Sequence, residues 1–328
     1  MNDIRFFDTT MRDGEQGIGY LLTNEQKLNL LKRLIKLGVS VIELGMVTDK
    51  ESKELFEKAL VIAGDTNIAA LCRLNENDIT QTIKVLRPFP NSTINLLCIG
   101  SELHLEKKIQ ISQSEALNLL NRTIMQVREM KFQGNIYAIL EDSSRGSEYF
   151  LRGLIDHLIM NGIYNICFAD TVGSMTPSSV RSRLNNFVKN YPNLNLSVHF
   201  HNDLGLAVAN TIEAIEAGVK EVQVTLGGIG ERCGNASFEE VIGILNNCYP
   251  YKDKIFSKIK LREIVNVCQY FYTLIGKKPN HNKPLLGENA FSTCAGIHQS
   301  AILKHPETYE FIDSESIGMK RSFHYNRL

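Results

Sequence analysis

Several features that define common classes of protein are missing from this chain of 328 residues. Lysine plus arginine and aspartate plus glutamate both number 36, so the formal charge is zero and no sequence-wide basic field exists for nucleic acid or an anionic membrane. The apolar runs are strand-sized, far shorter than the roughly 20 residues that span a bilayer, and no signal-peptide pattern begins the chain. We therefore expect a cytoplasmic protein with small-molecule substrates and no nucleic-acid or membrane partner.

The chain also lacks paired cysteines. Its seven cysteines are scattered and form no CxxC pair. We interpret most of them as buried thiols in a reducing compartment. Cys233 lies in a polar loop and is a candidate nucleophile, but no general base is fixed beside it by the sequence, so packing is the preferred role.

Short apolar runs alternate with longer amphipathic segments from residue 4 to about residue 247. The runs that predict strands are residues 4–7, 39–44, 67–72, 93–99, 135–140, 164–169, 196–201 and 220–225. The segment 24–38 typifies the predicted helices, because its leucines recur at helical spacing before a terminal glycine. Eight such units predict an α/β fold, a TIM (β/α)8 barrel over residues 1–250. An open doubly wound sheet is the alternative, but no GxGxxG turn follows the first strand.

Polar and charged residues follow nearly every predicted strand. In a TIM barrel the C-terminal strand ends share one face, where the active site lies. In chain order these residues are Arg12 and Asp13, Glu43, Arg73, Ser101 and His104, Glu141 and Asp142, Asp170 and Thr171, His199 and His201, and the loop GGIGERCGN at 227–235. One barrel mouth is therefore expected to collect both signs of charge and several histidines.

Three of these residues suggest a metal site. His199 and His201 are two apart on a strand, so their side chains point to the same face, and Asp13 adds an oxygen ligand from the first strand. Such a set leaves about three positions of an octahedron open, which suits Mn²⁺, Mg²⁺ or Zn²⁺ as a Lewis acid. The alternative is a pair of core histidines satisfied by their neighbours.

Two neighbouring residues admit two roles each. The amide oxygen of Asn235 is either a further metal ligand or a cap of the last barrel helix, and the sequence alone favours the cap. Arg12 cannot lose its proton and suits a substrate carboxylate or a developing enolate oxygen, with a structural ion pair as the alternative.

Residues 251–328 predict a short, partly helical appendage. It begins with an amphipathic helix at 261–276, whose apolar stripe is Ile264, Val267, Phe271 and Leu274. The following stretch, 277–292, is rich in proline, asparagine, lysine and glycine and is typical of an extended arm.

Four motifs together resemble the DRE-TIM metallolyase superfamily, and within it the Claisen-condensing branch of isopropylmalate, homocitrate and citramalate synthases. They are DTTMRDGEQGIG (8–19), HFHNDLGLAVANTIEAIEAG (199–218), GGIGERCGNASFEEV (227–241) and GENAFSTCAGIHQSAILKHPETYE (287–310), so the resemblance covers essentially the whole chain. It implies an acyltransferase that adds the acetyl group of acetyl-CoA to the ketone of a 2-oxo acid and then hydrolyses the thioester. Lyases such as 3-hydroxy-3-methylglutaryl-CoA lyase fit less well, because their first loops usually lack the Glu-Gln pair.

The resemblance also implies roles for individual residues. It makes Asp13, His199 and His201 metal ligands, with Asn235 approaching the metal directly or through water. It places Arg12, Gln16, Arg73 and Thr171 around the oxo acid, His104 in the pocket wall and Glu141 near the reacting carbon. It brings His298 and Tyr309 into the active site from the appendage, which in this family commonly docks on the partner subunit of a homodimer. His298 is then a reasonable base for the methyl proton of acetyl-CoA.

The chain resembles a short form of these enzymes. Isopropylmalate synthases typically continue into a second subdomain and a regulatory domain, so feedback control through that domain is not expected here. The motif CFADTVG (167–173) leans toward homocitrate synthases, whereas the C-terminal motif leans toward isopropylmalate synthase. We place 2-oxoisovalerate first as the oxo acid, giving 2-isopropylmalate in leucine biosynthesis. A retro-aldol lyase and a binding-only metabolite sensor are the other hypotheses.

Overall fold

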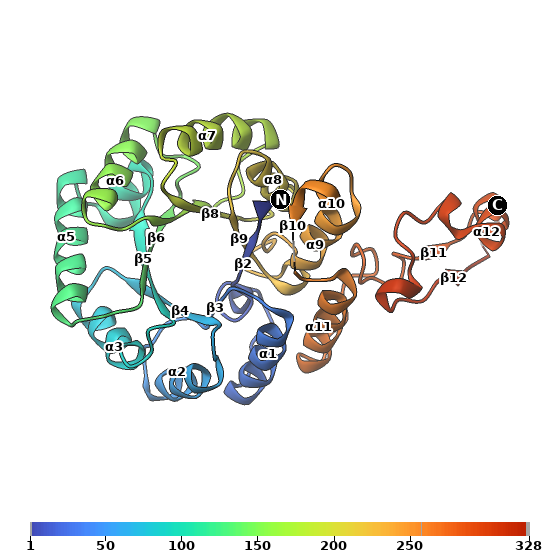
Figure 1. The fold of residues 1–328 in the computed structure, drawn as a ribbon, viewed down its shortest axis with the longest axis horizontal. Helices are drawn as coiled ribbons and strands as arrows, with labels where there is room; N and C mark the ends of the chain where they lie inside the picture. Colours follow the sequence, from blue (N-terminus) through green and yellow to red (C-terminus); the bar gives the residue numbers. More distant parts are fainter. Residues whose placement is uncertain (1, 257, 326–328) are drawn as a thin grey trace.

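A closed barrel of eight parallel strands forms the centre of the molecule (Figure 1). The computed structural model describes residues 2–256 and 258–325. The barrel strands are β2 (Arg5–Asp8), β3 (Val41–Glu43), β4 (Asn67–Arg73), β5 (Ser92–Ile99), β6 (Asn135–Glu141), β7 (Asn165–Asp170), β8 (Asn195–Phe200) and β9 (Glu221–Val224). Each predicted strand overlaps one of them, and β9 pairs with β2 to close the ring. The predicted TIM barrel is confirmed, and the open doubly wound sheet is wrong.

Helices surround the barrel and cover the outer faces of its strands (Figure 1). They are α1 (Asn24–Leu37), α2 (Lys50–Ile62), α3 (Glu76–Leu86), α5 (Gln113–Glu129), α6 (Glu148–Met160), α7 (Pro177–Asn190), α8 (Ala207–Glu216) and α9 (Phe238–Asn247). Helix α1 begins at a capping box made by Thr23 and Gln26. It ends at Gly38, whose φ of 86° is left-handed and favours glycine.

Short elements modify the ends of the strands. A 3-10 turn, η1 (Gly14–Gln16), follows β2, and another, η3 (Leu226–Gly228), follows β9. After β5 the chain forms one turn of α-helix, α4 (Glu102–His104), and then a π-helical turn, η2 (Leu105–Ile109). At the other end of the barrel β1 (Asn2–Asp3) pairs with β10 (Ile255–Phe256), which follows α10 (Tyr251–Lys254).

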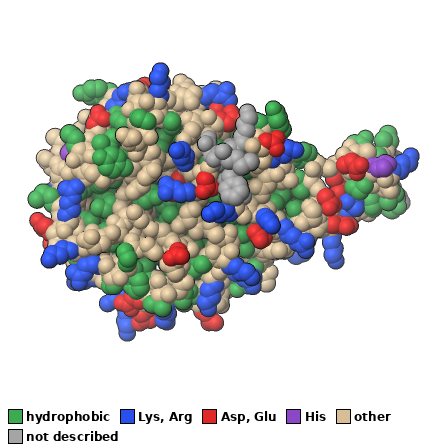
Figure 2. Space-filling model, viewed as in Figure 1, with side chains coloured by type: hydrophobic (Ala, Val, Ile, Leu, Met, Phe, Trp, Pro, Cys, Tyr) green, Lys and Arg blue, Asp and Glu red, His purple; other side chains and the backbone are tan. Residues whose placement is uncertain are grey.

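The C-terminal part of the chain divides into a helix on the barrel and a projecting segment. Helix α11 (Leu261–Leu274) buries Ile264, Val267 and Phe271 and packs against α9 and α1. Beyond it lie β11 (Ser292–Thr293), α12 (Gly296–Lys304), η4 (Pro306–Thr308), η5 (Glu315–Ile317) and β12 (Ser322–Phe323), with β11 and β12 paired. Figures 1 and 2 show this segment as a separate lobe on a narrow neck, well away from the barrel centre.

Lys283 anchors that neck to the barrel. Its ammonium forms ion pairs with Glu240 and, at 3.4 Å, with Glu239 of α9. Glu239 is fully buried and its Oε2 also accepts a hydrogen bond from the backbone of Gly227. Burial raises the pKa of Glu239, while the Lys283 charge opposes that rise. The carboxylate therefore depends on Lys283 for its charge compensation.

Replacing Lys283 with methionine is expected to destabilise the protein by about 3–5 kcal/mol, because removal of one partner leaves a buried charge uncompensated. Urea unfolding followed by circular dichroism measures this change. Lys278→Met is the matched control: Lys278 is 82% exposed and pairs with the exposed Glu288, so its removal should cost less than about 1 kcal/mol. Equal losses in the two variants would contradict the anchoring role.

Four of the seven cysteines are buried, namely Cys72, Cys98, Cys167 and Cys268. Cys233 and Cys294 are exposed, so the packing role preferred for Cys233 is wrong: its loop turns the side chain to solvent. Within residues 2–256 and 258–325, no helix is both long and apolar enough to cross a membrane.

Candidate active site

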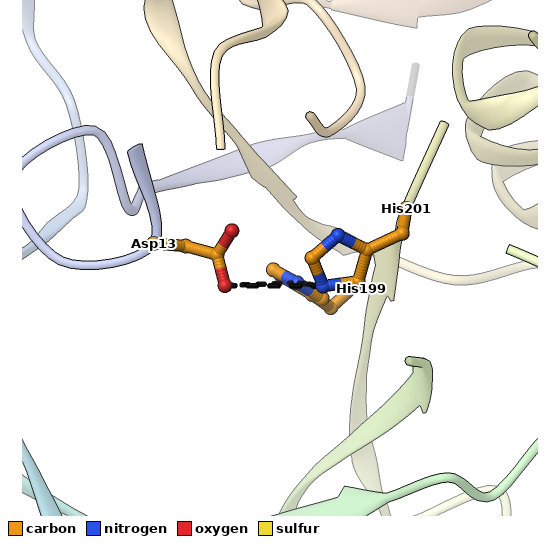
Figure 3. A group of neighbouring side chains, drawn as sticks. All are labelled: Asp13, His199 and His201. Atoms are coloured by element: carbon orange, nitrogen blue, oxygen red, sulfur yellow. Dashed lines mark hydrogen bonds and ion pairs between the residues drawn. The ribbon is translucent and has the colours of Figure 1, made fainter. Parts of the chain in front are cut away.

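Asp13, His199 and His201 form a compact, buried group at the barrel mouth (Figure 3). Asp13 follows β2, His199 lies near the end of β8, and His201 comes directly after that strand. His199 Nε2 and His201 Nε2 are 3.2 Å apart, and each lies 3.8 Å from Asp13 Oδ2. The point equidistant from these three atoms is roughly 2.1 Å from each, which matches metal–ligand distances of ~2.0–2.2 Å.

Hydrogen bonds on the far side of each imidazole select its tautomer. His201 Nδ1 lies 3.2 Å from the carbonyl oxygen of Gly234, which can only accept, so this nitrogen carries the proton. His199 Nδ1 likewise donates to Gln223 Oε1 at 3.0 Å. Both Nε2 atoms therefore present lone pairs to one another and to a carboxylate. Three facing lone pairs require a cation between them, so the residues fit a divalent metal.

The charge state of the group is also suited to a metal. Burial would raise the pKa of Asp13, but the Arg12 charge and the two histidines hold that pKa well below its usual range. Burial lowers the pKa of His199 to about 3 and also lowers that of His201. One carboxylate and two neutral imidazoles are the protonation states in which these side chains bind metals.

Asn235 adjoins the metal ligands and does not cap a helix. Its Nδ2 donates to Asp13 Oδ1 at 2.7 Å and to the carbonyl of Ile229 at 3.1 Å. The expectation of a cap is wrong, because α9 begins at Phe238 and its N-cap residue is Ser237. Asn235 Oδ1 is buried without a hydrogen-bond partner. This unpaired oxygen is available beside Asp13 to bind a metal ion or to accept a hydrogen bond from water.

Gly230 provides space beside these residues. A Cβ on Gly230 would lie 2.1 Å from Asn235 Nδ2 and 2.7 Å from Asp13 Oδ1, far inside contact distance. Its φ of +154° also lies in a region that other residues rarely adopt. The loop 227–235 therefore uses glycine because the backbone must approach Asp13 closely.

Arg12 connects the first two strands of the barrel mouth. Its Nε donates to Glu43 Oε2 at 2.5 Å and its Nη1 to Asp13 Oδ2 at 2.6 Å. Burial alone would lower the pKa of Arg12, but Glu43 and Asp13 together raise it, so the guanidinium stays charged. Glu43 is fully buried and also accepts from Asn95. The ion pair expected as the alternative for Arg12 is thus present, and the guanidinium still lines the central cavity.

A cavity of about 270 Å³ opens above the metal ligands. Its polar lining consists of Arg12, Asp13, Gln16, Glu141, Thr171, His199, His201, Glu231 and Arg232. Its apolar lining consists of Leu71, Leu97, Ile139 and Ala169, one residue from each of β4 to β7. With His199 of β8, five neighbouring strands, β4 to β8, contribute side chains to the lining of this cavity. Glu231 and Arg232 were missed as site residues, although they lie inside the glycine-rich loop that the sequence singled out.

Arg73 lies outside this cavity. Its guanidinium pairs with Asp78 of α3 through contacts of 2.6 and 3.2 Å, and 61% of its side chain is exposed. It lines a neighbouring apolar cavity of about 280 Å³ between the strand ends and α5. The structure therefore does not bring Arg73 together with the metal ligands in this conformation of the chain.

Glu141 lies on the wall shared by the two cavities. Lys108 of η2 donates to both of its carboxylate oxygens, at 2.6 and 2.8 Å. His104 lies behind it, with Nδ1 3.7 Å from Glu141 Oε2. Thr171 faces the cavity, and its Oγ1 accepts from the backbone N–H of Asp142 at 2.9 Å. Lys108 was not identified from the sequence, because a lysine on an irregular turn carries no spacing signal.

His298 and Tyr309 lie together in the projecting lobe and not at the mouth of their own barrel. Their rings stack with centroids 3.9 Å apart. Both are exposed to solvent, Tyr309 by 50%, and both line a cavity of about 540 Å³ formed wholly by residues 284–312. Figure 1 shows α12, the helix that carries His298, in the projecting lobe, away from the barrel.

Comparison with known proteins agrees with this geometry. The HMGL-like family model matches residues 3–270, which is most of the chain. The chain belongs to the HMGL-like family. Residues 285–328 match a second family model, the homocitrate synthase post-HMGL domain-like region. The two models together span both the barrel and the projecting lobe.

Curated relatives include 2-isopropylmalate synthases. The enzyme of Ruminiclostridium cellulolyticum is 36% identical over 323 residues, covering 96% of this chain and 62% of its own length. The enzyme of Aquifex aeolicus is 34% identical over 325 residues, covering 97% of this chain and 62% of its own. This chain therefore spans less than two thirds of the length of these relatives.

Among solved structures, the hydroxymethylglutaryl-CoA lyase of Pseudomonas aeruginosa superposes with a TM-score of 0.72. The two chains are 19% identical, and the match covers 85% of this chain and 95% of the lyase. At that identity the likeness concerns the fold alone, so it does not separate a lyase from a condensing enzyme.

Proposed function

We propose that this protein condenses acetyl-CoA with a 2-oxo acid at a divalent metal and then hydrolyses the thioester. The observation that carries the proposal is the buried group of Asp13, His199 and His201 at the mouth of an HMGL-like barrel. The 2-isopropylmalate synthases among its relatives support 2-oxoisovalerate as the oxo acid and 2-isopropylmalate as the product. The short match to the homocitrate synthase region makes homocitrate synthesis from 2-oxoglutarate the second candidate, and citramalate synthesis from pyruvate a third.

The residues around Asp13, His199 and His201 would bind and orient the oxo acid. An Mn²⁺, Mg²⁺ or Zn²⁺ ion held by Asp13, His199 and His201, with Asn235 beside them, would polarise the ketone of the oxo acid as a Lewis acid. Arg12 is permanently charged and hydrogen-bonds the negative oxygens of the substrate, assisted by Gln16 and Thr171 on the cavity wall. Glu141 lines the same cavity, and we assign it a position near the reacting carbon.

A base must remove a methyl proton from acetyl-CoA before the new C–C bond forms between that carbon and the ketone carbon. The oxygen of the ketone then takes a proton, and water later replaces the CoA thiol at the thioester. We assign the base to His298, with Tyr309 stacked beside it. Because this pair lies in the projecting lobe and does not line the cavity of its own barrel, we propose a homodimer in which each lobe completes the partner's site.

The cavity lining favours an oxo acid with an apolar side chain. Leu71, Leu97 and Ile139 form an apolar floor, and burying a second carboxylate against them would require a free cation. Neither arginine of the cavity is free for a second carboxylate: Arg12 pairs with Glu43 and Asp13 and is assigned above to the oxygens common to all 2-oxo acids, and Arg232 pairs with Asp203 at 2.7 Å. A branched aliphatic side chain needs no such partner.

We therefore expect thiol release from acetyl-CoA to be about 10- to 100-fold faster in kcat/KM with 2-oxoisovalerate than with 2-oxoglutarate. A coupled thiol-reagent assay across 2-oxoisovalerate, 2-oxoglutarate, pyruvate and oxaloacetate measures this preference. Faster turnover of 2-oxoglutarate would replace the assignment by homocitrate synthesis. Cleavage of 3-hydroxy-3-methylglutaryl-CoA without any condensation would place the protein with the lyases, and no turnover of either kind would favour a binding-only sensor.

A further inference from the structure

His104 lies between Glu141, the last residue of β6, and Asp142, which follows it. Its Nδ1 is 3.7 Å from Glu141 Oε2, and its Nε2 is 3.6 Å from Asp142 Oδ2. Only 16% of the side chain is exposed, and Nδ1 is buried without a hydrogen-bond partner. Glu141 lines the cavity at the candidate metal site. On the side of Glu141 that faces His104, its carboxylate meets an N–H group if Nδ1 carries the imidazole proton, and a lone pair if it does not.

Arg145 determines which nitrogen carries that proton. Its Nη2 lies 3.4 Å from His104 Nε2. A guanidinium can only donate, so Nε2 must accept and the proton of a neutral imidazole must reside on Nδ1. The other tautomer would direct two N–H groups at one another. Arg145 therefore turns the otherwise unpartnered Nδ1 into a donor directed at Glu141.

Asp142 holds Arg145 in place although 36% of the arginine side chain is exposed. Arg145 Nε donates to Asp142 Oδ1 at 2.8 Å, and Ser101 Oγ donates to Asp142 Oδ2 at 2.5 Å. Asp142 is fully buried and has a left-handed φ of 63°, which is unusual for a residue other than glycine. Such a conformation persists only where the surroundings enforce it, so the loop after β6 is rigidly fixed.

A second neighbour of Glu141, Lys108, also acts as a hydrogen-bond donor to its carboxylate. Lys108 approaches from η2, and its ammonium donates to both carboxylate oxygens of Glu141, at 2.6 and 2.8 Å. Among the described residues, Glu141, Asp142 and Arg145 are the charged groups in direct contact with the His104 ring. A donor on His104 Nδ1 and the ammonium of Lys108 would thus hold Glu141 from two sides.

We propose that Arg145 is a positioning residue that selects the Nδ1–H tautomer of His104 and thereby orients Glu141 toward the metal cavity. Nothing in the sequence motifs distinguishes Arg145 from a solvated surface arginine; the role follows from its donor contact with His104 Nε2. The catalytic consequence rests on the proposed function, whereas the tautomer itself does not.

Nitrogen NMR of protein labelled with ¹⁵N-histidine and loaded with diamagnetic Mg²⁺ or Zn²⁺ tests the tautomer directly. The His104 signals are assigned by their loss in His104→Gln. At neutral to mildly alkaline pH we expect a protonated Nδ1 and an unprotonated Nε2, and a loss of that bias in Arg145→Met. A wild-type Nε2–H tautomer, a doubly protonated ring, or an unchanged spectrum in Arg145→Met would overturn the proposal.

The activity assay uses the same variant. In Arg145→Met we expect kcat to fall by about 3- to 10-fold with little change in KM for acetyl-CoA, the range expected for one lost hydrogen bond. Arg145→Lys retains a donor and should recover part of that loss. Arg152→Met is the matched control, because Arg152 has a similar exposure of 38% and pairs with Glu148 on α6, outside the His104 cluster. A normal tautomer with no condensing activity on any oxo acid would refute the proposed function and leave the role of Arg145 intact.

Discussion

Replacing His201 with alanine is expected to weaken binding of the divalent ion by well over 10-fold and to remove nearly all thiol release. Loss of an outer-shell partner alone typically costs about 10- to 100-fold in metal affinity, and among the described residues His201 supplies one of the three ligand atoms that lie close together at this site. The variant also leaves Asp13 and His199 without the third corner of the site. Metal content after dialysis, measured by atomic emission together with the thiol-release rate, gives both quantities.

The control for this experiment is His157→Ala. His157 lies in the last turn of α6, does not line the cavity at the candidate metal site, and hydrogen-bonds Asn121 at 2.7 Å. It should retain the full metal content and rate, once circular dichroism has shown that both variants are folded. Unchanged metal stoichiometry in folded His201→Ala would rule out the assignment of His201 as a ligand.

Mixing two inactive variants is expected to restore activity if the lobes are exchanged between subunits. In a dimer of His298→Ala with His201→Ala, the first chain supplies an intact barrel and the second supplies an intact His298. Random pairing should then recover about a quarter of the wild-type rate, because half of the dimers are mixed and each mixed dimer has one intact site. Co-refolding the two chains and measuring thiol release tests this expectation.

The matched control is a mixture of His199→Ala with His201→Ala. Both changes damage the barrel, so no pairing can produce an intact site and no activity should return. If the first mixture also stays inactive although heterodimers are demonstrated by mass spectrometry, then each barrel uses its own His298, or His298 is not the base. The exposed stacking of His298 on Tyr309, outside its own barrel, is the observation that motivates the experiment.

The sequence by itself determined the barrel and the grouping of Asp13, His199 and His201, three residues that could hold a metal ion. The alternation of apolar runs with amphipathic segments is compatible with few folds, because parallel strands must be joined by long crossover connections. Eight such strand–helix units form a closed barrel. Residues two apart on a strand point to the same face, so the sequence alone predicts that the side chains of His199 and His201 lie together. Asp13 could be added because C-terminal strand ends of a parallel barrel meet at one mouth.

Only the tertiary structure decided which partner each charged side chain takes. Arg12 pairs with Glu43 across two strands, Arg73 pairs with Asp78, and Asn235 binds Asp13 and not a helix end. These choices depend on side-chain directions that vary with local backbone geometry and that no periodicity encodes. The same holds for Arg145, whose contact with His104 requires the left-handed turn at Asp142. The spacing of residues along a strand and the alternation of strands with helices recur along the chain, so both can be predicted from the sequence. The partner of a long charged side chain depends instead on which side chains the folded chain brings near it.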